Sequence, residues 1–497
     1  MYRTVMNRRY IIGIDQSTQG TKAIMVGHDG EIIDKTYLPH KQIISENGWV
    51  SHDGEELFRN TVLAVKMLME RSVVKKHEIA GIGISNQRET TVAWNRETGQ
   101  TVGPAIVWQC SRAKMITAAF AGSQLERAVL EKTGIPLSPF FPAAKAAWML
   151  QNNPLARKLA DDRQLCIGTV DSWLVYGLTD GEVFKTDASN ASRTQLYNIH
   201  SLQWDPEICE ALGIPIHVLP EVENSNGDFG CTTLCGYFDE PVPIRAVLGD
   251  SHAALYGHGC VNEGMAKATY GTGSSIMMNT GPSFKASRHG LVSSLAWSID
   301  GRVNYVLEGN INYSGAVITW LQKDLGLIST ASESDALAAK ANPADSTYLV
   351  PAFSGLGAPY WSNDARALFC GMSRTTGRAE LIKAGLESIA YQVTDIVEAM
   401  EADSGIRLSA LQVDGGPTAN HYLMQFQSDM TQKKLYVPKT EELSALGAAY
   451  MAGVSAGVLD AEILQGNDTK KCYEPVMNKT ERDKKYSGWK AAVQKTV

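Results

Sequence analysis

Two copies of one short pattern constrain the fold of this chain more than any other feature. The first copy, YIIGIDQSTQGTK at residues 10–22, is an apolar run that ends at Asp15 and is followed by a polar turn. A second apolar run begins at residue 23, so the pattern predicts a β-hairpin with a polar tip. The second copy spans 266–279, and its turn is built from glycine, threonine and serine. A pattern that returns so far along the chain indicates a duplicated domain with a cleft between its halves.

The composition of both tips favours phosphate binding. Backbone N–H groups meet anionic oxygens, hydroxyls add donors, and a carboxylate such as Asp15 helps to hold Mg²⁺. Either copy taken alone is equally well explained as an ordinary surface hairpin. The repetition is what moves the interpretation towards a phosphate site.

Apolar periodicity and turn residues predict an α/β layer around each copy. After the first copy we expect a strand at 31–38, a helix at 53–71, a buried strand at 79–85 and a hairpin formed by 91–94 and 105–108. Around the second copy we expect strands at 290–298 and 302–308 and a helix at 310–325. Towards the C-terminus we expect a strand at 411–414, helices at 421–430 and 444–457, an irregular polar stretch from Gly466 and a helix near 480–493.

Polar residues follow two of the predicted buried strands. The strand at 79–85 leads into Asn86-Gln87-Arg88-Glu89-Thr90, and the run IRAVLGD at 244–250 closes on Asp250. Ligands of open α/β sheets collect at the carboxyl ends of strands, where these residues fall. Gly415 and Gly416, just before a helix, would let the backbone approach a ligand closely.

Composition and charge exclude several function classes. At 497 residues the chain is too long for one ordinary domain, and a net charge of −7 argues against nucleic acid as a main partner. No apolar stretch reaches the length of a membrane span, and the leader at 1–9 lacks the apolar core of a signal peptide. Eight cysteines without a zinc-type spacing indicate reduced thiols in the cytoplasm.

Six further motifs resemble those of the FGGY carbohydrate kinases, and most closely the members that phosphorylate glycerol. They are SNQRETTVAW (85–94), AIVWQCSR (105–112), NASRTQLYNIH (190–200), GMAKATYGTG (264–273), GLGAPYW (355–361) and DSGIRLSALQVDGG (403–416). The resemblance runs from Tyr10 to about Lys495. It implies an α/β fold of two ribonuclease-H-like (actin-like ATPase) domains with an interdomain cleft. The implied boundaries are 1–258 for the substrate and phosphate site and 259–497 for the nucleotide site.

The resemblance also implies an activity and a set of site residues. The activity is ATP- and Mg²⁺-dependent phosphorylation of a terminal hydroxyl of a small polyol, with glycerol as the first candidate. Asp250 matches the base that accepts the hydroxyl proton, a role that phosphoryl transfer requires. The substrate positions are Arg88, Glu89, Trp108, Phe140, Asp250, Ser251 and Ser275, and Asp15 matches the metal position. The ATP positions are Ser17, Thr18, Gln19, Lys22, Thr272, Gly273, Gly315, Thr319, Gly416 and Asn420.

Three of these positions depart from the glycerol-binding pattern. Phe140 replaces a tyrosine, Ser251 a glutamine and Ser275 a phenylalanine that walls the pocket. Burying a large aromatic ring against a ligand contributes roughly 1.5–3 kcal/mol, so its loss weakens glycerol binding about 10–100-fold if nothing replaces it. Two interpretations stay open: a larger four- or five-carbon polyol or ketose as substrate, or a glycerol pocket restored by His252 or another side chain.

The stretch at 230–243 has no counterpart of the bisphosphate-binding loop or the phosphorylatable histidine that regulate some family members.

Competing classes fit less well. A P-loop, a dinucleotide fingerprint and protein-kinase signatures are also missing from the sequence. A non-enzymatic actin-like protein would need the phosphate tips but not Arg88, Glu89, Trp108 and Asp250. A homodimer is the family expectation.

Overall fold

The computed structural model describes residues 8–465 and 469–497, so the expectations for the first seven residues and for Gly466 lie outside the described residues. The chain forms two compact units. The first unit contains residues 8–259, 294–305 and 442–465. The second unit contains residues 260–293, 306–441 and 469–497.

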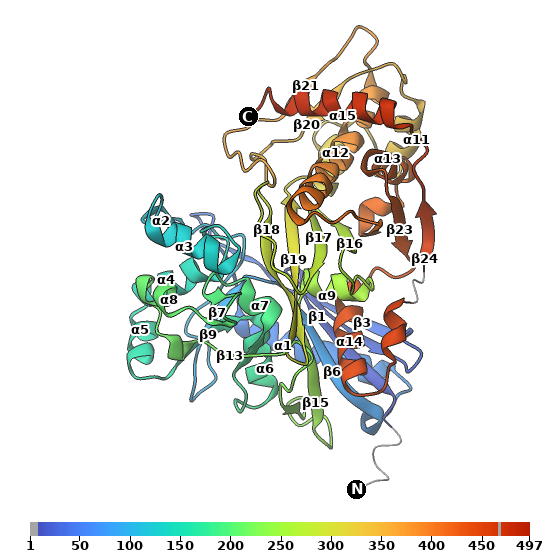
Figure 1. Cartoon of the computed structure of the whole chain (residues 1–497). Coiled ribbons are helices and arrows are strands. Elements are labelled where there is room, and N and C mark those ends of the chain that lie inside the picture. Colours follow the sequence, from blue (N-terminus) through green and yellow to red (C-terminus); the bar gives the residue numbers. More distant parts are fainter. Residues whose placement is uncertain (1–7, 466–468) are drawn as a thin grey trace. The chain divides into compact units, whose positions relative to one another are not determined.

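The first unit is built on a six-stranded sheet in the order β14-β15-β6-β1-β2-β3 (Figure 1). Its strands are β1 (Tyr10–Gln16), β2 (Gly20–Val26), β3 (Ile32–Pro39), β6 (Ile79–Asn86), β14 (Cys231–Thr232) and β15 (Val242–Gly249). The hairpin of β1 and β2 is antiparallel, as predicted, and β6 runs parallel to both β1 and β15. The carboxyl ends of β1, β6 and β15 therefore meet at one edge of the sheet.

Alternate residues of the central strands face different helices. Ile12 and Ile14 are buried in the same apolar cluster as Leu57 and Val65 of α1 (Gly54–Arg71). Gly13, which points to the opposite face, lies so close to α14 (Leu443–Ser455) that a Cβ atom would meet the Ala445 carbonyl oxygen at 2.5 Å. The helix predicted at 444–457 is thus confirmed as α14, and it packs closely along β1 and β6 (Figure 1).

The first unit also contains a second, five-stranded sheet and a second apolar cluster. This sheet contains β4 (Ile43–Ile44), β5 (Val50–His52), β8 (Ala105–Ile106), β7 (Thr91–Asn95) and β9 (Leu165–Thr169). The other helices of this unit are α2 (Lys114–Ala118), α3 (Gln124–Thr133), α4 (Pro142–Asn152), α5 (Pro154–Asp161), α6 (Val170–Leu178), α7 (Ala188–Ser192), α8 (Pro206–Ala211) and α9 (Asp250–Gly257). Two-stranded ladders join β10 (Lys185–Asp187) to β13 (Glu221–Glu223) and β11 (Tyr197–Asn198) to β12 (Gln203–Trp204).

The prediction that Trp108 ends a strand is wrong. The strand β8 stops at Ile106, and the Cys110 N–H closes a turn on the Val107 carbonyl at 2.9 Å. The apolar run continues past the strand because the turn is buried on the same cluster. Trp108 consequently lies in a turn.

The second unit repeats the strand order of the first. Its sheet runs β18-β19-β17-β16-β22-β23-β24, formed by β16 (Ala266–Tyr270), β17 (Ser274–Gly281), β18 (Val292–Ile299), β19 (Arg302–Ile311), β22 (Ala410–Asp414), β23 (Lys434–Pro438) and β24 (Thr469–Tyr473). As β1 does with β2 and β6, β16 pairs antiparallel with β17 and parallel with β22. Residues 294–305, which form most of β18, the turn after it and the start of β19, belong to the first unit. The predicted duplication is therefore visible in the topology.

The helices of the second unit cover this sheet and build its core. They are α10 (Gly315–Lys323), α11 (Glu333–Lys340), α12 (Arg378–Ser404), α13 (His421–Thr431) and α15 (Lys479–Val493), and a short ladder joins β20 (Tyr348–Val350) to β21 (Leu368–Cys370). Helix α10 starts at Gly315 rather than residue 310, because β19 continues to Ile311. The polar stretch expected to be irregular after Gly466 contains β24 from Thr469 onwards, which pairs with β23.

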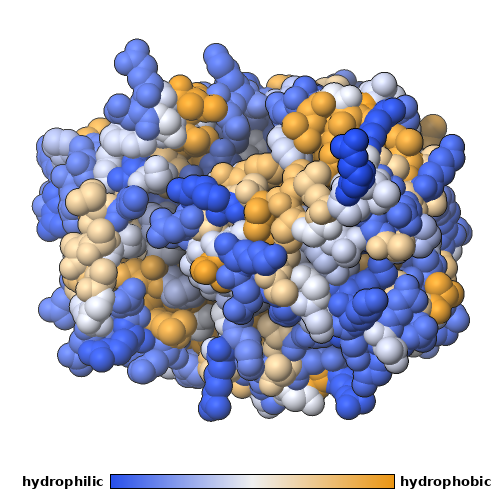
Figure 2. Space-filling model, turned by 90° about the horizontal axis from the view of Figure 1, so that it is seen from above, coloured by the Kyte–Doolittle hydropathy of each residue, from blue (hydrophilic) through white to orange (hydrophobic). Residues whose placement is uncertain are grey.

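The face seen in Figure 2 is mainly hydrophilic, with apolar residues interspersed in small groups. Among the residues that the structure describes, no helix combines the length and the apolar character needed to cross a membrane.

Candidate functional site

The edge where β1, β6 and β15 end gathers the predicted acids and bases of the first unit. Asp15 pairs with Ser85 across the β1–β6 ladder, and Gly249 pairs with Asn86 across the β15–β6 ladder. Asp250 is the first residue of α9 rather than the last of a strand, because the chain turns helical directly after Gly249. The predicted strand-end acid thus occupies a strand-to-helix junction.

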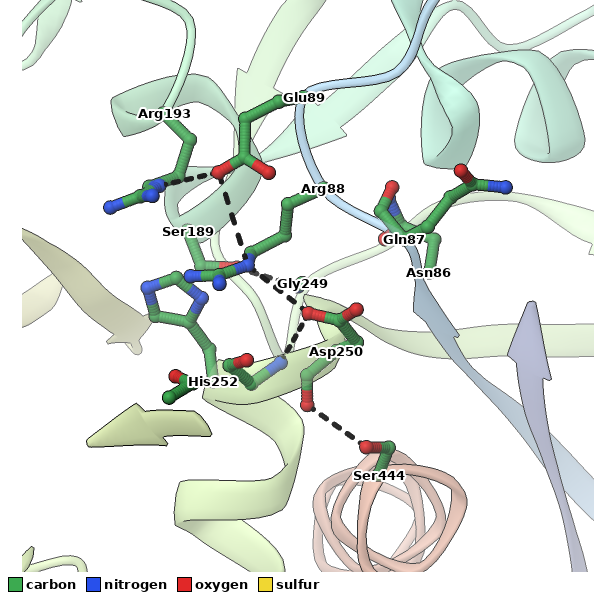
Figure 3. Close-up of polar contacts among 12 residues, drawn as sticks. Asn86, Gln87, Arg88, Glu89, Ser189, Arg193, Gly249, Asp250, His252 and Ser444 are labelled. Carbon is green, nitrogen blue, oxygen red and sulfur yellow. Dashed lines mark hydrogen bonds and ion pairs between the residues drawn. The ribbon is translucent and has the colours of Figure 1, made fainter. Parts of the chain in front are cut away.

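Arg88 lies between the two carboxylates expected to handle substrate (Figure 3). Its Nε is 3.1 Å from Asp250 Oδ1 and 3.9 Å from Glu89 Oε1. The Glu89 and Arg88 side chains are 4% and 9% exposed, whereas the Asp250 side chain is 34% exposed. A Cβ at position 249 would come within 2.7 Å of Arg88 Cγ, so the glycine leaves room for this contact. The site therefore has one accessible carboxylate, that of Asp250, in contact with the buried guanidinium of Arg88.

Glu89 is held in an unusual backbone conformation. Its φ of 61° is in the left-handed region, which is uncommon outside glycine. The Glu89 carboxylate is also bound by Arg193, whose Nε donates to Glu89 Oε1 at 2.7 Å (Figure 3). Arg193 was not predicted as a site residue, although it stands inside one of the motifs that carry the family resemblance.

Two aromatic rings lie beside the first hairpin tip. The ring centroids of Trp108 and Phe140 are 5.3 Å apart, and the indole Nε1 of Trp108 donates to Thr18 Oγ1 at 3.0 Å. Lys145, which is fully buried, donates to the Phe140 carbonyl, and burial lowers the pKa of Lys145 to about 7. The two rings together form an apolar surface, and Lys145 holds the backbone of Phe140 in place.

The polar side chains of the first tip mostly contact the protein itself. Ser17 Oγ donates to the Gly20 carbonyl at 2.8 Å, whereas the exposed Gln19 is held through its backbone carbonyl, which accepts from the His40 backbone N–H at 2.8 Å. Lys22 Nζ is 2.6 Å from Glu442 Oε2. Burial opposes the charge on Lys22, but its hydrogen bond and charge interaction with Glu442 raise its pKa above the ordinary value. Lys22 therefore stays cationic in this tip.

Asp15 is the predicted metal position, and its surroundings fit a cation. Burial and the nearby charge of Asp250 raise the pKa of Asp15 to about 7, and Ser85 Oγ donates to its Oδ1 at 3.0 Å. The described residues contain no group of three or more His, Cys, Asp or Glu that could hold a metal by themselves. This donor set suits Mg²⁺, which takes one or two carboxylates and completes its shell with phosphate oxygens and water.

The second unit contains a pocket of about 660 Å³ at its own hairpin tip. Four predicted ATP positions line it, namely Thr272, Gly315, Thr319 and Gly416. Aromatic rings of Tyr313, Trp320 and Phe353 line the same pocket. Backbone N–H groups beside aromatic rings offer a nucleotide both phosphate donors and a stacking surface.

Two further predicted ATP positions have structural contacts instead. Asn420 caps α13, accepting from Leu423 N at 2.9 Å, and its Nδ2 donates to Ser334 Oγ at 2.9 Å. At Gly273 a Cβ atom would collide with the Ile311 carbonyl oxygen, so the tip is pressed against β19. Both residues shape the tip and the helix next to the pocket.

The serine positions that depart from the family pattern lie in different units. Ser251 donates its backbone N–H to Asp250 Oδ1 at 2.6 Å in the first unit. In the second unit, Ser275 Oγ donates to Glu308 Oε1 at 3.2 Å and lies 3.5 Å from Lys267 Nζ. His252 is buried beside Arg88, with Nε2 3.4 Å from Ser294 Oγ (Figure 3).

Both halves of the chain match known kinase domains. Residues 10–257 match the N-terminal domain of the FGGY family of carbohydrate kinases, and residues 266–456 match its C-terminal domain. The chain is 43% identical over 491 residues to the glycerol kinase of Caldanaerobacter subterraneus, covering 98% of this chain and 99% of that protein. It is 44% identical over 492 residues to the glycerol kinase of Desulfitobacterium hafniense, covering 99% of this chain and 100% of that protein.

Solved structures of kinases also match this chain. The glycerol kinase of Plasmodium falciparum, crystallised with ADP, is 36% identical with a TM-score of 0.92, over 98% of both chains. A xylulose kinase of Lactobacillus acidophilus, 22% identical, has a TM-score of 0.87 over 98% of this chain and 97% of that chain, and shows the shared fold. The predicted fold of two actin-like domains is confirmed.

Proposed function

Because the chain belongs to the FGGY family of carbohydrate kinases, we propose that it transfers the γ-phosphate of ATP to a terminal hydroxyl of glycerol, giving glycerol 3-phosphate. The observation that carries this proposal is the 43–44% identity to glycerol kinases along the whole chain. The contact between Arg88 and Asp250 supports it, because a kinase acting on an alcohol needs an accessible base beside its substrate site.

In this proposal the first unit binds the acceptor. Asp250 accepts the proton of the attacking hydroxyl, Arg88 and Glu89 bind the other hydroxyls, and Trp108 and Phe140 contact the carbon chain. Asp250 is the natural base because it is the most exposed of the three charged groups and its partner Arg88 holds it in place. Ser251 belongs to the same set in the first unit, and Ser275 is a further proposed substrate position in the second unit.

The donor is proposed to be ATP with Mg²⁺. In the first tip Ser17, Thr18, Gln19 and Lys22 would face the phosphates, and Asp15 would hold the metal. The pocket lined by Thr272, Gly315, Thr319 and Gly416 would take the nucleotide, with Gly273 and Asn420 shaping its surroundings. Bound Mg²⁺ would neutralise charge on the transferring phosphoryl group. A division into domains 1–258 and 259–497 follows from the same assignment.

A larger polyol or ketose is the second candidate substrate. Phe140 has no hydroxyl to donate, and Ser275 places a hydroxyl among Lys267 and Glu308 where the family pattern has an aromatic ring. Of these three side chains, Lys267 and Glu308 are buried and Ser275 is partly exposed, so the Ser275 hydroxyl is the group proposed to bind an additional substrate hydroxyl.

One experiment decides between the two substrates. The purified protein is given ATP, Mg²⁺ and each of a series of three- to six-carbon polyols and ketoses, and both ADP and the phosphorylated product are measured. We expect the highest kcat/KM for glycerol. A tenfold higher kcat/KM for a four- or five-carbon compound would establish the second candidate, and no acceptor-dependent ADP in the series would refute both.

We also propose a cytoplasmic, homodimeric enzyme. The location is supported by the cysteines, since all eight are free thiols, as expected of a reducing compartment. The dimer rests on the family expectation alone, and light scattering of the purified protein would give its mass in solution.

A further inference from the structure

One short buried segment, Asp187–Arg193, contacts the ends of β6 and β15, the two strands that lead into Arg88, Glu89 and Asp250 of the proposed substrate site. It comprises the last residue of β10, helix α7 and the residue after it. Asp187, Ser189, Asn190 and Arg193 are each at most 1% exposed. Such buried polar groups are expected to be fully hydrogen-bonded, and their partners reveal what the segment holds.

Ser189 holds the residue before Asp250. The backbone N–H of Gly249 donates to Ser189 Oγ at 2.9 Å (Figure 3). Gly249 is the N-cap of α9, whose first residue is Asp250, so this bond fixes the junction at which the proposed base stands.

Asn190 holds the end of the strand that leads to Arg88. Its Nδ2 donates to Asn86 Oδ1 at 3.0 Å, and Asn86 Nδ2 donates back to Asn190 Oδ1 at 3.0 Å. A reciprocal amide pair constrains both position and orientation. Because Asn86 lies two residues before Arg88, the pair constrains the backbone that leads into Arg88.

Asp187 ties these two contacts together. Its Oδ1 accepts from Ser189 Oγ at 3.0 Å and from Asn190 Nδ2 at 2.8 Å. The same carboxylate accepts the backbone N–H groups of Ser189 and Asn190, both at 2.9 Å. One buried acid therefore orients both side chains.

Arg193 completes the segment by holding Glu89. Its Nε donates to Glu89 Oε1 at 2.7 Å, and its guanidinium lies 5.2 Å from the centre of the Phe141 ring.

We propose that three residues of this segment are positioning residues of the phosphoryl-transfer site: Ser189 places Asp250, Asn190 places Arg88 and Arg193 places Glu89. The inference rests on the proposed function for the roles of those three residues. Its physical basis is that catalysis depends on alignment, so that a displacement of about 1 Å costs on the order of 100-fold in rate. The segment itself touches no substrate.

The same helix supplies a matched control. Ser192 is fully buried, donates to the Ser189 carbonyl at 2.9 Å and accepts from the Leu295 N–H at 3.1 Å. Like Ser189, its hydroxyl therefore donates one hydrogen bond and accepts one. Ser192→Ala and Ser189→Ala should lower Tm to a similar extent, but only Ser189→Ala releases the junction before Asp250.

The test compares kinetics and amide exchange of the two variants in the full-length protein. We expect Ser189→Ala to lower kcat about 10–100-fold with the KM for polyol within about threefold of wild type, and Ser192→Ala to leave both within about threefold. Arg193→Gln should show the opposite split, with a larger rise in the polyol KM than fall in kcat. Equal kcat values for the two serine variants would overturn the proposal.

Hydrogen exchange measured by mass spectrometry separates this inference from the proposed function. Ser189→Ala should accelerate exchange in the peptide containing Gly249, and Ser192→Ala in the peptide containing Leu295. If the wild type phosphorylated no polyol, the proposed function would fail while this exchange pattern still reported the positioning. Unchanged exchange at Gly249 in Ser189→Ala would overturn the positioning whatever the activity.

Discussion

The two hairpin tips share one topology but are stabilised in different ways. The tip between β1 and β2 is braced by side chains, since Trp108 donates to Thr18 and Lys22 pairs with Glu442. The tip between β16 and β17 is braced by backbone. There the Gly315 N–H donates to the Gly271 carbonyl at 2.9 Å, and the Ser314 N–H donates to the Thr272 carbonyl at 2.8 Å.

The difference indicates how a duplicated domain diverged. In the first unit the strands next to the tip lead into Arg88, Glu89 and Asp250, side chains suited to an acceptor and its proton. In the second unit the tip opens on a pocket with glycines and aromatic rings, where backbone can lie against a nucleotide. We therefore expect the second tip to be sensitive to added bulk and the first to lost side-chain contacts.

Adding bulk to the second tip should have the largest effect on the nucleotide side. In Gly273→Ala the new methyl group collides with the Ile311 carbonyl oxygen and displaces the tip, so the KM for ATP should rise about 10–100-fold. In Gly271→Ala the nearest atom is 3.4 Å away, an ordinary contact, and the rise should be much smaller. Initial rates at varied ATP measure both. Equal KM values for the two variants would contradict the backbone account of this tip.

Removing a cation from the first tip should have a moderate effect. In Lys22→Met a charge proposed to face the phosphates is lost, and kcat/KM for ATP should fall about tenfold. Lys35→Met is the matched control, because Lys35 Nζ contacts the other oxygen of Glu442 at 2.9 Å but is 60% exposed. An equal loss in both variants would show that the Glu442 pairing, rather than phosphate contact, determines the role of Lys22.

The smallest effect concerns the pH dependence of stability. His40 braces the first tip through Thr21 Oγ1 at 2.9 Å and lies 3.1 Å from Asn60 Nδ2, which needs a neutral ring nitrogen as acceptor. Burial and the neighbouring His52 lower the pKa of His40 to about 4. Its contribution is present above the unfolded pKa of about 6.5 and is lost as pH falls towards 4.

Urea unfolding checks this effect. Because the ring is only partly buried, the wild type should lose about 1–2 kcal/mol from this residue between pH 7 and pH 4. His40→Gln should show a correspondingly weaker fall in the free energy of unfolding. Parallel pH profiles for the two proteins would remove His40 from the account.

The local pattern of the sequence predicts the central strands and the meeting of Arg88 with Asp250. Apolar runs that end in polar residues mark β1, β6 and β15, and neighbouring parallel strands bring their ends together. Helix α12 was not predicted because it is buried on nearly all sides, including at Glu387, Gln392 and Asp395, and so lacks a polar face.

Contacts over long sequence separations account for the other differences. Trp108 leaves the strand to donate to Thr18, 90 residues earlier in the chain. Glu89 and Arg193 are 104 residues apart, and neither local sequence identifies the other as its partner. Ser189 and Asn190 likewise resemble ordinary helix-capping residues until their partners Gly249 and Asn86 are seen.

The central claim is that Asp250 is the base of a kinase acting on a polyol, and Asp250→Asn tests it most directly. The rate of phosphoryl transfer to glycerol and the affinity for ATP are measured for the variant and the wild type. We predict a fall in kcat of about 1,000-fold, since general bases contribute on the order of 100–10,000-fold, with the Kd for ATP unchanged. An Asp250→Asn variant that phosphorylates glycerol at a rate close to that of the wild type would contradict the account.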